Sequence, residues 1–109
     1  MNWMSSGLEL NGILANNDEM ALGASMAVKA AGRAASKVVI GGIDGTQDGL
    51  RAIETGDIDV TVFQDAAGQG RGALETALKL ARGETVPSKT YIPFQLVTRE
   101  NVKDFQGSN

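Results

Sequence analysis

The stretch Val38-Val-Ile-Gly-Gly-Ile-Asp-Gly-Thr46 is an apolar run followed by an Asp-Gly turn and a residue that caps helices well. Two other short apolar runs, at 12–15 and 60–63, are also followed by polar residues. Runs of this length suit buried strands, and segments of roughly 10–16 residues with helical periodicity alternate with them. Such alternation is typical of βαβ units. We therefore predict an α/β fold, a Rossmann-like, mostly parallel sheet with flanking helices.

The first predicted helix spans about residues 19–31. Asp18 is expected to cap it, because Asp is among the preferred N-cap residues, and Gly32 offers a stop after its last turn. Apolar residues recur at helical spacing and should face the sheet: Met20, Ala24, Ala27, Val28 and Ala31. Because most of these side chains are small, we expect the helix to pack close to the sheet.

A second helix is predicted over about 47–55. Thr46 is its expected cap, and Gly56 its expected end. Leu50 and Ile53 lie on one side of this helix and should point into the core.

The rest of the chain gives a third helix and a less regular end. The helix covers about 67–82, ends before Gly83, and carries one apolar stripe made of Leu74, Ala77, Leu78 and Ala81. Residues 89–98 have strand composition, but Pro93 cannot donate to a ladder, which predicts an edge strand or a crossing point. Residues 1–9 resemble the end of a helix.

A polar side chain stands behind each of the three apolar runs: Asn17, Asp44 and Gln64. The carboxyl ends of parallel strands meet at one edge of a sheet, where open α/β proteins bind ligands, so we expect these side chains to lie together. A carboxylate accepts two hydrogen bonds at once, and amides both donate and accept, which suits neighbouring hydroxyl groups. The sequence therefore predicts a site for a neutral sugar or polyol.

Each of these residues also has a purely structural interpretation. Asn17 is as good a cap as Asp18, Asp44 precedes Gly45 as turn residues often do, and Gln64 carries little local signal. We expect Asp18 to be the cap and Asn17 the ligand contact. Three further acidic residues are expected to face solvent: Asp57, Asp59 and Asp65.

The residues that are missing limit the chemistry. The chain has no histidine and no cysteine, which excludes histidine triads, imidazole acid–base catalysis, thiolate metal sites and disulfides. No phosphate-binding glycine motif follows a strand. A magnesium pair of Asp44 and Asp48 is the enzymatic alternative that stays open. We predict no catalytic residue, no metal site, no cofactor and no enzymatic activity.

The composition describes one small domain. The 109 residues are 42% hydrophobic and 21% charged. With 10 basic and 13 acidic residues the net charge is −3, and no basic cluster is present, so nucleic acid is not an expected partner. No apolar stretch approaches the roughly 20 residues that cross a bilayer. The first residues lack the basic and apolar regions of a secretion signal, so the chain as written is expected to be soluble and not exported.

Three blocks of the sequence resemble one protein family: Ile13-Leu-Ala-Asn-Asn-Asp-Glu-Met-Ala-Leu-Gly-Ala24, Val39-Ile-Gly-Gly-Ile-Asp-Gly-Thr46 and Thr61-Val-Phe-Gln-Asp65. In order and spacing they resemble the carboxy-terminal part of periplasmic sugar-binding proteins of the ribose/galactose type, which have the type I periplasmic-binding-protein fold. The resemblance covers about residues 10–105. The ending Phe94-Gln-Leu-Val-Thr-Arg-Glu-Asn101 is most similar to members that bind inositol or related polyols.

The resemblance implies a function and a division of the chain. It implies a solute-binding protein that takes a monosaccharide or cyclic polyol and passes it to the membrane permease of an ABC transporter. Residues 1–64 would belong to the carboxy-terminal lobe, 65–93 to the amino-terminal lobe, and 94–109 to a return crossing and tail. Three residues match the family's ligand contacts in the carboxy-terminal lobe: Asn17, Asp44 and Gln64.

Family members are much longer, so the resemblance also implies a fragment. Half a cleft is expected to bind sugar weakly or not at all, and exposed apolar faces favour self-association. The family resemblance points to the periplasm, whereas a fragment without a signal peptide is expected to remain in the cytoplasm. The alternative function is the effector-binding core of a LacI-type regulator, which shares this fold and similar Asn-Asp and Asp-Gly blocks.

Overall fold

The computed structural model describes residues 2–33 and 38–107. Met1, part of the helix end expected over residues 1–9, lies outside the described residues, as do residues 108–109 of the predicted tail. The elements follow in this order: α1 (Asn2–Ser5), β1 (Gly12–Leu14), α2 (Asp18–Ala30), β2 (Val39–Asp44), α3 (Gln47–Thr55), β3 (Val60–Phe63), α4 (Ala66–Ala81), β4 (Gln95–Thr98) and the 3-10 helix η2 (Val102–Phe105). The α/β class is confirmed.

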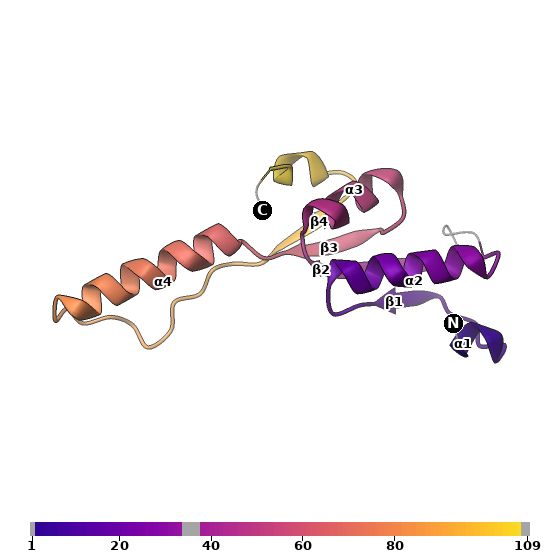
Figure 1. Cartoon of the computed structure of the whole chain (residues 1–109). Coiled ribbons are helices and arrows are strands. Elements are labelled where there is room, and N and C mark those ends of the chain that lie inside the picture. The colour runs from indigo at the N-terminus through magenta and orange to yellow at the C-terminus, as the bar shows by residue number, and fades with distance from the viewer. Residues whose placement is uncertain (1, 34–37, 108–109) are drawn as a thin grey trace.

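The described strands form one sheet in the order β1-β2-β3-β4 (Figure 1). The first three strands are parallel, and β4 pairs antiparallel with β3. Gly41 lies opposite Val60, and Phe63 lies opposite Gln95, so the start of β4 lies at the carboxyl edge of the parallel strands. The mostly parallel sheet is therefore confirmed. Only 95–98 of the predicted 89–98 strand pairs, and this segment starts after Pro93 and lies at the sheet edge.

Helices α2 and α3 cover one face of the sheet. Thr46 caps α3 by accepting from the Gly49 amide, and Gly56 ends the helix with φ of 83°, as the sequence predicted. Leu50 and Ile53 of α3 are buried, which is also confirmed. The core they join consists of Ala21, Val28, Val38, Ile40, Leu50, Ala52, Ile53, Ile58, Phe63, Val97 and Val102.

The buried face of α2 agrees with the predicted stripe at Val28 but differs at both ends of the stripe. Met20 is 57% exposed, and Ala31 is also exposed, whereas the buried residues of the helix are Asp18, Ala21, Ser25 and Val28. The carboxylate of Asp18 is hydrogen-bonded inside the protein, so the residues that follow it at helical spacing turn toward the sheet. An internal hydrogen-bonded acid, which hydrophobic periodicity does not reveal, sets the rotation of this helix.

The opposite face of the sheet carries exposed apolar side chains. Leu14 is 87% exposed, and Val39 and Leu96 are also exposed. Parallel sheets are usually covered on both faces. In this chain the described helices cover only one of the two faces of the sheet.

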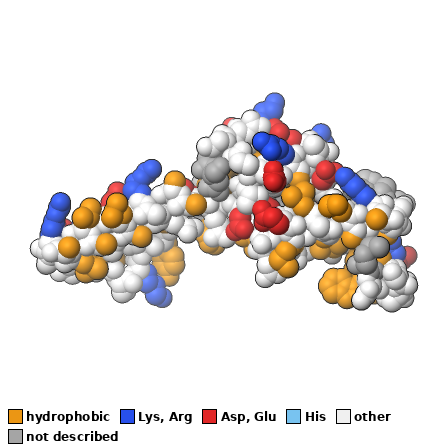
Figure 2. All heavy atoms as spheres, in the orientation of Figure 1, with side chains coloured by type: hydrophobic (Ala, Val, Ile, Leu, Met, Phe, Trp, Pro, Cys, Tyr) orange, Lys and Arg blue, Asp and Glu red, His pale blue; other side chains and the backbone are white. Residues whose placement is uncertain are grey.

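Residues 65–93, called here the arm, extend away from the sheet (Figure 1). None of the residues of α4 is buried, and its predicted apolar stripe is exposed, Leu74 by 63%. The radius of gyration is 18.0 Å, against about 13 Å for a compact domain of this length. Figure 2 shows hydrophobic side chains spread over the surface of the arm. The helix itself is confirmed, but all four residues of its predicted apolar stripe are exposed.

Candidate functional site

The three predicted site residues stand where β1, β2 and β3 end. Asp44 is the last residue of β2, Gln64 directly follows β3, and Asn17 lies three residues beyond β1. The backbone N–H of Gln64 donates to the Asp44 carbonyl over 3.1 Å. Their side chains also meet, because Gln64 Nε2 donates to Asp44 Oδ1 over 2.9 Å. The fold thus brings the acid and one amide into direct contact at the carboxyl edge of the sheet.

Asp44 has an unusual backbone conformation. Its φ is 112°, and it is the one non-glycine residue with positive φ among the described residues. Gly45 follows with φ of 69°, and a Cβ there would lie 2.7 Å from Cδ2 of Phe63. Positive φ is strained for an L-residue, and such strain gathers at functional sites. The turn therefore aims Asp44 in a direction that a relaxed strand end would not allow.

Asn17 has a structural role that the sequence assigned to its neighbour. Its Oδ1 accepts from the Met20 amide over 2.8 Å, so Asn17 is the N-cap of α2, and the prediction that Asp18 caps this helix is wrong. The capping bond uses the amide oxygen, and the NH₂ group of the same side chain carries two donors. Asn17 lies at the same sheet edge as the other two residues, partly exposed.

Asp18 is completely buried, with 0% exposure. Its Oδ2 accepts from the backbone N–H of Thr46 over 2.8 Å, and its Oδ1 accepts from the Thr61 hydroxyl over 2.5 Å. This role cannot be distinguished in the sequence from helix capping, because Asp is a common residue at helix starts. The sequence signal for this role is Gly49, because glycine is unfavourable inside a helix. The structure gives the reason for it: a Cβ at Gly49 would lie 2.1 Å from Asp18 Oδ2.

The three acidic residues expected to face solvent each have a structural partner. Asp59 Oδ2 accepts from the Ile40 amide over 2.7 Å, and Asp65 caps α4 through the Gly68 amide. Asp57 pairs with Lys29, and this hydrogen bond lowers the pKa of the Asp57 carboxyl below its ordinary value of 3.8. Asp59 is exposed, as the sequence predicted, whereas Asp57 and Asp65 are only partly exposed.

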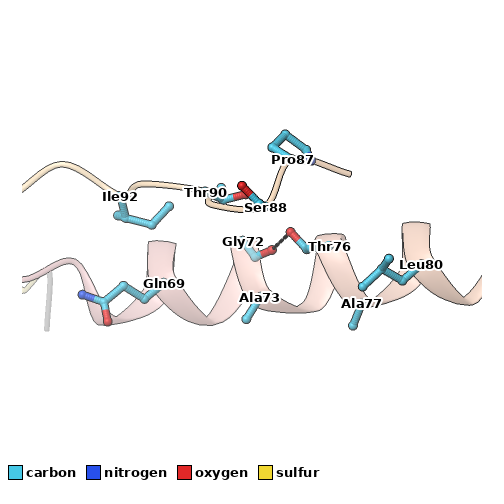
Figure 3. A pocket seen from close by; sticks show the side chains of 10 residues that line it. All are labelled: Gln69, Gly72, Ala73, Thr76, Ala77, Leu80, Pro87, Ser88, Thr90 and Ile92. Carbon is cyan, nitrogen blue, oxygen red and sulfur yellow. Dashed lines mark hydrogen bonds between the residues drawn. The ribbon is translucent and has the colours of Figure 1, made fainter. Parts of the chain in front are cut away.

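The hollows on the described part of the chain include two that are lined by residues other than Asn17, Asp44 and Gln64. One, of about 410 Å³, lies between α4 and the chain that returns beside it, and its lining is mostly apolar. Figure 3 shows Ser88, Thr90 and Ile92 of the returning chain lying along α4, and a Cβ at Gly72 would lie 3.3 Å from Cδ1 of Ile92. The other, of about 560 Å³, is more polar and is lined by Phe63, Asp65, Gln95, Asn101, Asp104 and Phe105. The second hollow lies beside the sheet edge where Gln64 stands.

Within residues 2–33 and 38–107, no group of three or more acidic side chains is placed to hold a metal ion.

In the described part of the chain, no helix combines the length and the apolar character that a membrane crossing requires.

Comparison with known proteins assigns the family. A model described as "periplasmic binding protein domain" matches residues 1–85 of the chain. The chain belongs to this family. A protein of Rhizobium meliloti named for rhizopine binding is 58% identical over 99% of the chain. A xylitol-binding protein of Mycolicibacterium smegmatis is 39% identical over 93% of it. This periplasmic binding protein domain therefore has relatives named for the binding of small solutes.

A solved structure confirms the predicted fold. An ABC transporter solute-binding protein of Bacillus halodurans with bound myo-inositol superposes with a TM-score of 0.90, at 46% identity over 99% of the chain. These three similar proteins are described as binding proteins, neither as enzymes nor as transcriptional regulators. The chain spans about a third of their length: 35% and 29% of the two relatives and 37% of the solved chain.

Proposed function

We propose that this chain forms part of a solute-binding protein of an ABC transporter and contacts a sugar or cyclic polyol. Asn17, Asp44 and Gln64 are the proposed ligand contacts. The observation that carries the proposal is the pairing of Asp44 with Gln64 at the carboxyl edge of the sheet, on a backbone turn with positive φ. An acid held by an amide offers acceptors and donors in fixed positions, as vicinal hydroxyl groups require.

The similar proteins favour a polyol. The protein of known structure contains myo-inositol, and one relative is named for xylitol. Neither ligand carries a charge, and the proposed contacts include no Lys or Arg. A site of this kind selects ligands by hydroxyl pattern, because a missing hydroxyl leaves a polar group unpaired at a cost of about 1–3 kcal/mol.

The division of the chain is part of the same proposal. Residues 1–64 form the ligand-binding edge of one lobe, 65–93 belong to a second lobe, and 94–109 return to the first. The exposed state of α4 supports this division, because a helix with no buried residue and an apolar stripe is suited to packing against another body. In the 109-residue chain alone, the same stripe supports self-association.

The cellular context follows from the family. Its members are periplasmic binding proteins, and we propose that the whole protein works in the periplasm and delivers its ligand to a membrane permease.

Ligand-observed saturation-transfer NMR tests the ligand class. The probes are myo-inositol, xylitol and D-ribose with the purified 109-residue chain, and cyclohexanol serves as a control with one hydroxyl group. Because one lobe supplies only part of a cleft, we expect weak binding, with a dissociation constant on the order of 1 mM. Saturation transfer to at least one polyol, but not to cyclohexanol, supports the proposal. A folded chain that transfers saturation to none of the polyols contradicts it.

A further inference from the structure

We infer that Asp18 is a positioning residue for the ligand site, acting through Thr46 and Thr61. Thr46 lies two residues after Asp44, and Thr61 lies three residues before Gln64. The third proposed contact, Asn17, is the direct chain neighbour of Asp18. The inference rests on the proposed function for its ligand, but the geometry it describes can be tested without one.

The hydrogen bonds of Asp18 join three separate segments. Oδ2 accepts from the Thr46 amide over 2.8 Å and from the Thr46 hydroxyl over 3.3 Å. Oδ1 accepts from the Thr61 hydroxyl over 2.5 Å. One carboxylate at the start of α2 therefore holds the loop between β2 and α3 and the middle of β3. These are the segments from which Asp44 and Gln64 extend.

The surrounding backbone leaves room for this carboxylate. A Cβ at Gly42 would lie 2.3 Å from Asp18 Oδ1, and one at Gly49 would lie 2.1 Å from Oδ2. Gly42 is in β2 and Gly49 is in α3, so both walls of the space occupied by the carboxylate are glycines. Any side chain at either position would displace the acid.

The energetics favour a carboxylate at this position. No Lys or Arg pairs with Asp18 in the described part of the chain, so its buried group relies on donors from the backbone and hydroxyls. It lies in the first turn of α2 and beside the first turn of α3, where the dipoles of both helices favour negative charge. Both side-chain oxygens of Asp18 accept hydrogen bonds, whereas an asparagine side chain has a single acceptor oxygen. Asp18 therefore constrains the edge more tightly than an amide would.

The consequence for the site is preorganisation. The Asp44–Gln64 contact depends on the relative position of β2 and β3 at their carboxyl ends. Asp18 sets that position from the protein interior, through its hydrogen bonds to Thr46 and Thr61. A ligand then meets contacts that are already placed, so less ordering entropy is lost on binding. Removing the link should lower affinity even though Asp18 itself, at 0% exposure, lies beneath the surface that a ligand reaches.

A matched pair of variants at Thr61 tests the link. Thr61→Val removes the hydroxyl at constant shape, and Thr61→Ser keeps it. Two-dimensional NMR of each folded variant reports the backbone amide of Asp44 and the side-chain NH₂ of Gln64. We expect both signals to shift in Thr61→Val and to stay near their wild-type positions in Thr61→Ser. Affinity for myo-inositol should fall about fivefold in Thr61→Val only.

Asp18→Asn and Val28→Ala complete the set. Asp18→Asn should shift the same signals and lower affinity about tenfold, because an NH₂ group cannot accept from Thr46 or Thr61. Val28 is also fully buried on α2 but lies near its other end. Val28→Ala should lower thermal stability without moving the Asp44 and Gln64 signals. If Asp18→Asn does not fold, the Thr61 pair decides.

The outcomes separate this inference from the proposed function. Unmoved Asp44 and Gln64 signals in Thr61→Val overturn the positioning role of Asp18, whether or not the wild-type chain binds myo-inositol. If the signals move as expected but no polyol binds to the chain, the result supports the positioning role of Asp18. It then counts against the proposed ligand class. Equal shifts in Val28→Ala and Thr61→Val would also overturn the inference, because they would show general loosening.

Discussion

Gln64 and Asp44 are 20 positions apart in the chain, yet Gln64 Nε2 lies 2.9 Å from Asp44 Oδ1. The register of β2 and β3, in which Asp44 lies opposite Phe63, places the two residues side by side. An acid and an amide from neighbouring strands thereby form one polar surface. The proposed ligand site is built on this contact, and the following changes test it and the fold around it.

Replacing Asp44 by Asn should weaken polyol binding about tenfold. The variant keeps the size of the side chain and tolerates positive φ, but it loses a charged acceptor for two ligand hydroxyls. Saturation-transfer NMR with myo-inositol measures the change. Asp48→Asn is the control, because Asp48 is 72% exposed and pairs with Arg51 on the surface of α3. Equal loss in both variants would argue against a specific role for Asp44.

Gly49→Ala should destabilise the protein by about 2 kcal/mol, although alanine usually favours helices. Its Cβ would lie 2.1 Å from Asp18 Oδ2 and would have to displace a buried, hydrogen-bonded acid. Gly23→Ala in α2 is the opposite case, because a Cβ there meets nothing within 4 Å. It should stabilise by about 0.5–1 kcal/mol. Urea denaturation of both variants measures the difference in sign, and two changes of the same sign would contradict it.

The double variant Leu74→Gln and Leu78→Gln should reduce self-association of the 109-residue chain. Both leucines are exposed on α4, by 63% and 48%, so their replacement should cost less than about 0.5 kcal/mol in folding stability. Analytical ultracentrifugation over a range of concentrations measures the association. Met26→Gln, at a residue 70% exposed on α2, serves as the control. An oligomer unchanged by the double variant would exclude α4 as the contact surface.

The pair of Asp57 and Lys29 should make a small, pH-dependent contribution to stability. Because Lys29 lowers the pKa of Asp57 in the folded state, the contribution is complete above the ordinary value of 3.8. It is lost as the pH falls through the lowered folded value. Solvent screening keeps it below about 1 kcal/mol. Thermal denaturation between pH 5 and pH 2 should show a shallower decline for Asp57→Asn than for wild type, and identical slopes would exclude the effect.

Local chemistry predicted much of the fold. The nine-residue helix α3 is determined by Thr46, Leu50, Ile53 and Gly56, because a cap, two inward apolar positions and a stop are all local signals. The placement of Asn17, Asp44 and Gln64 at one edge also followed from the sequence, since the alternation of strands and helices implies parallel strands with carboxyl ends together.

The sequence by itself thus determined the strands and the helices, because these features depend on contacts a few residues apart. It also determined the edge at which the polar residues gather, because alternating strands and helices imply parallel strands whose carboxyl ends meet. The tertiary structure decided which neighbour caps α2, which face of α2 is buried, and that α4 stands exposed. Asn and Asp are equally good caps in isolation. Only the approach of Thr46 and Thr61, 28 and 43 residues further along the chain, draws Asp18 into the interior and leaves the capping to Asn17.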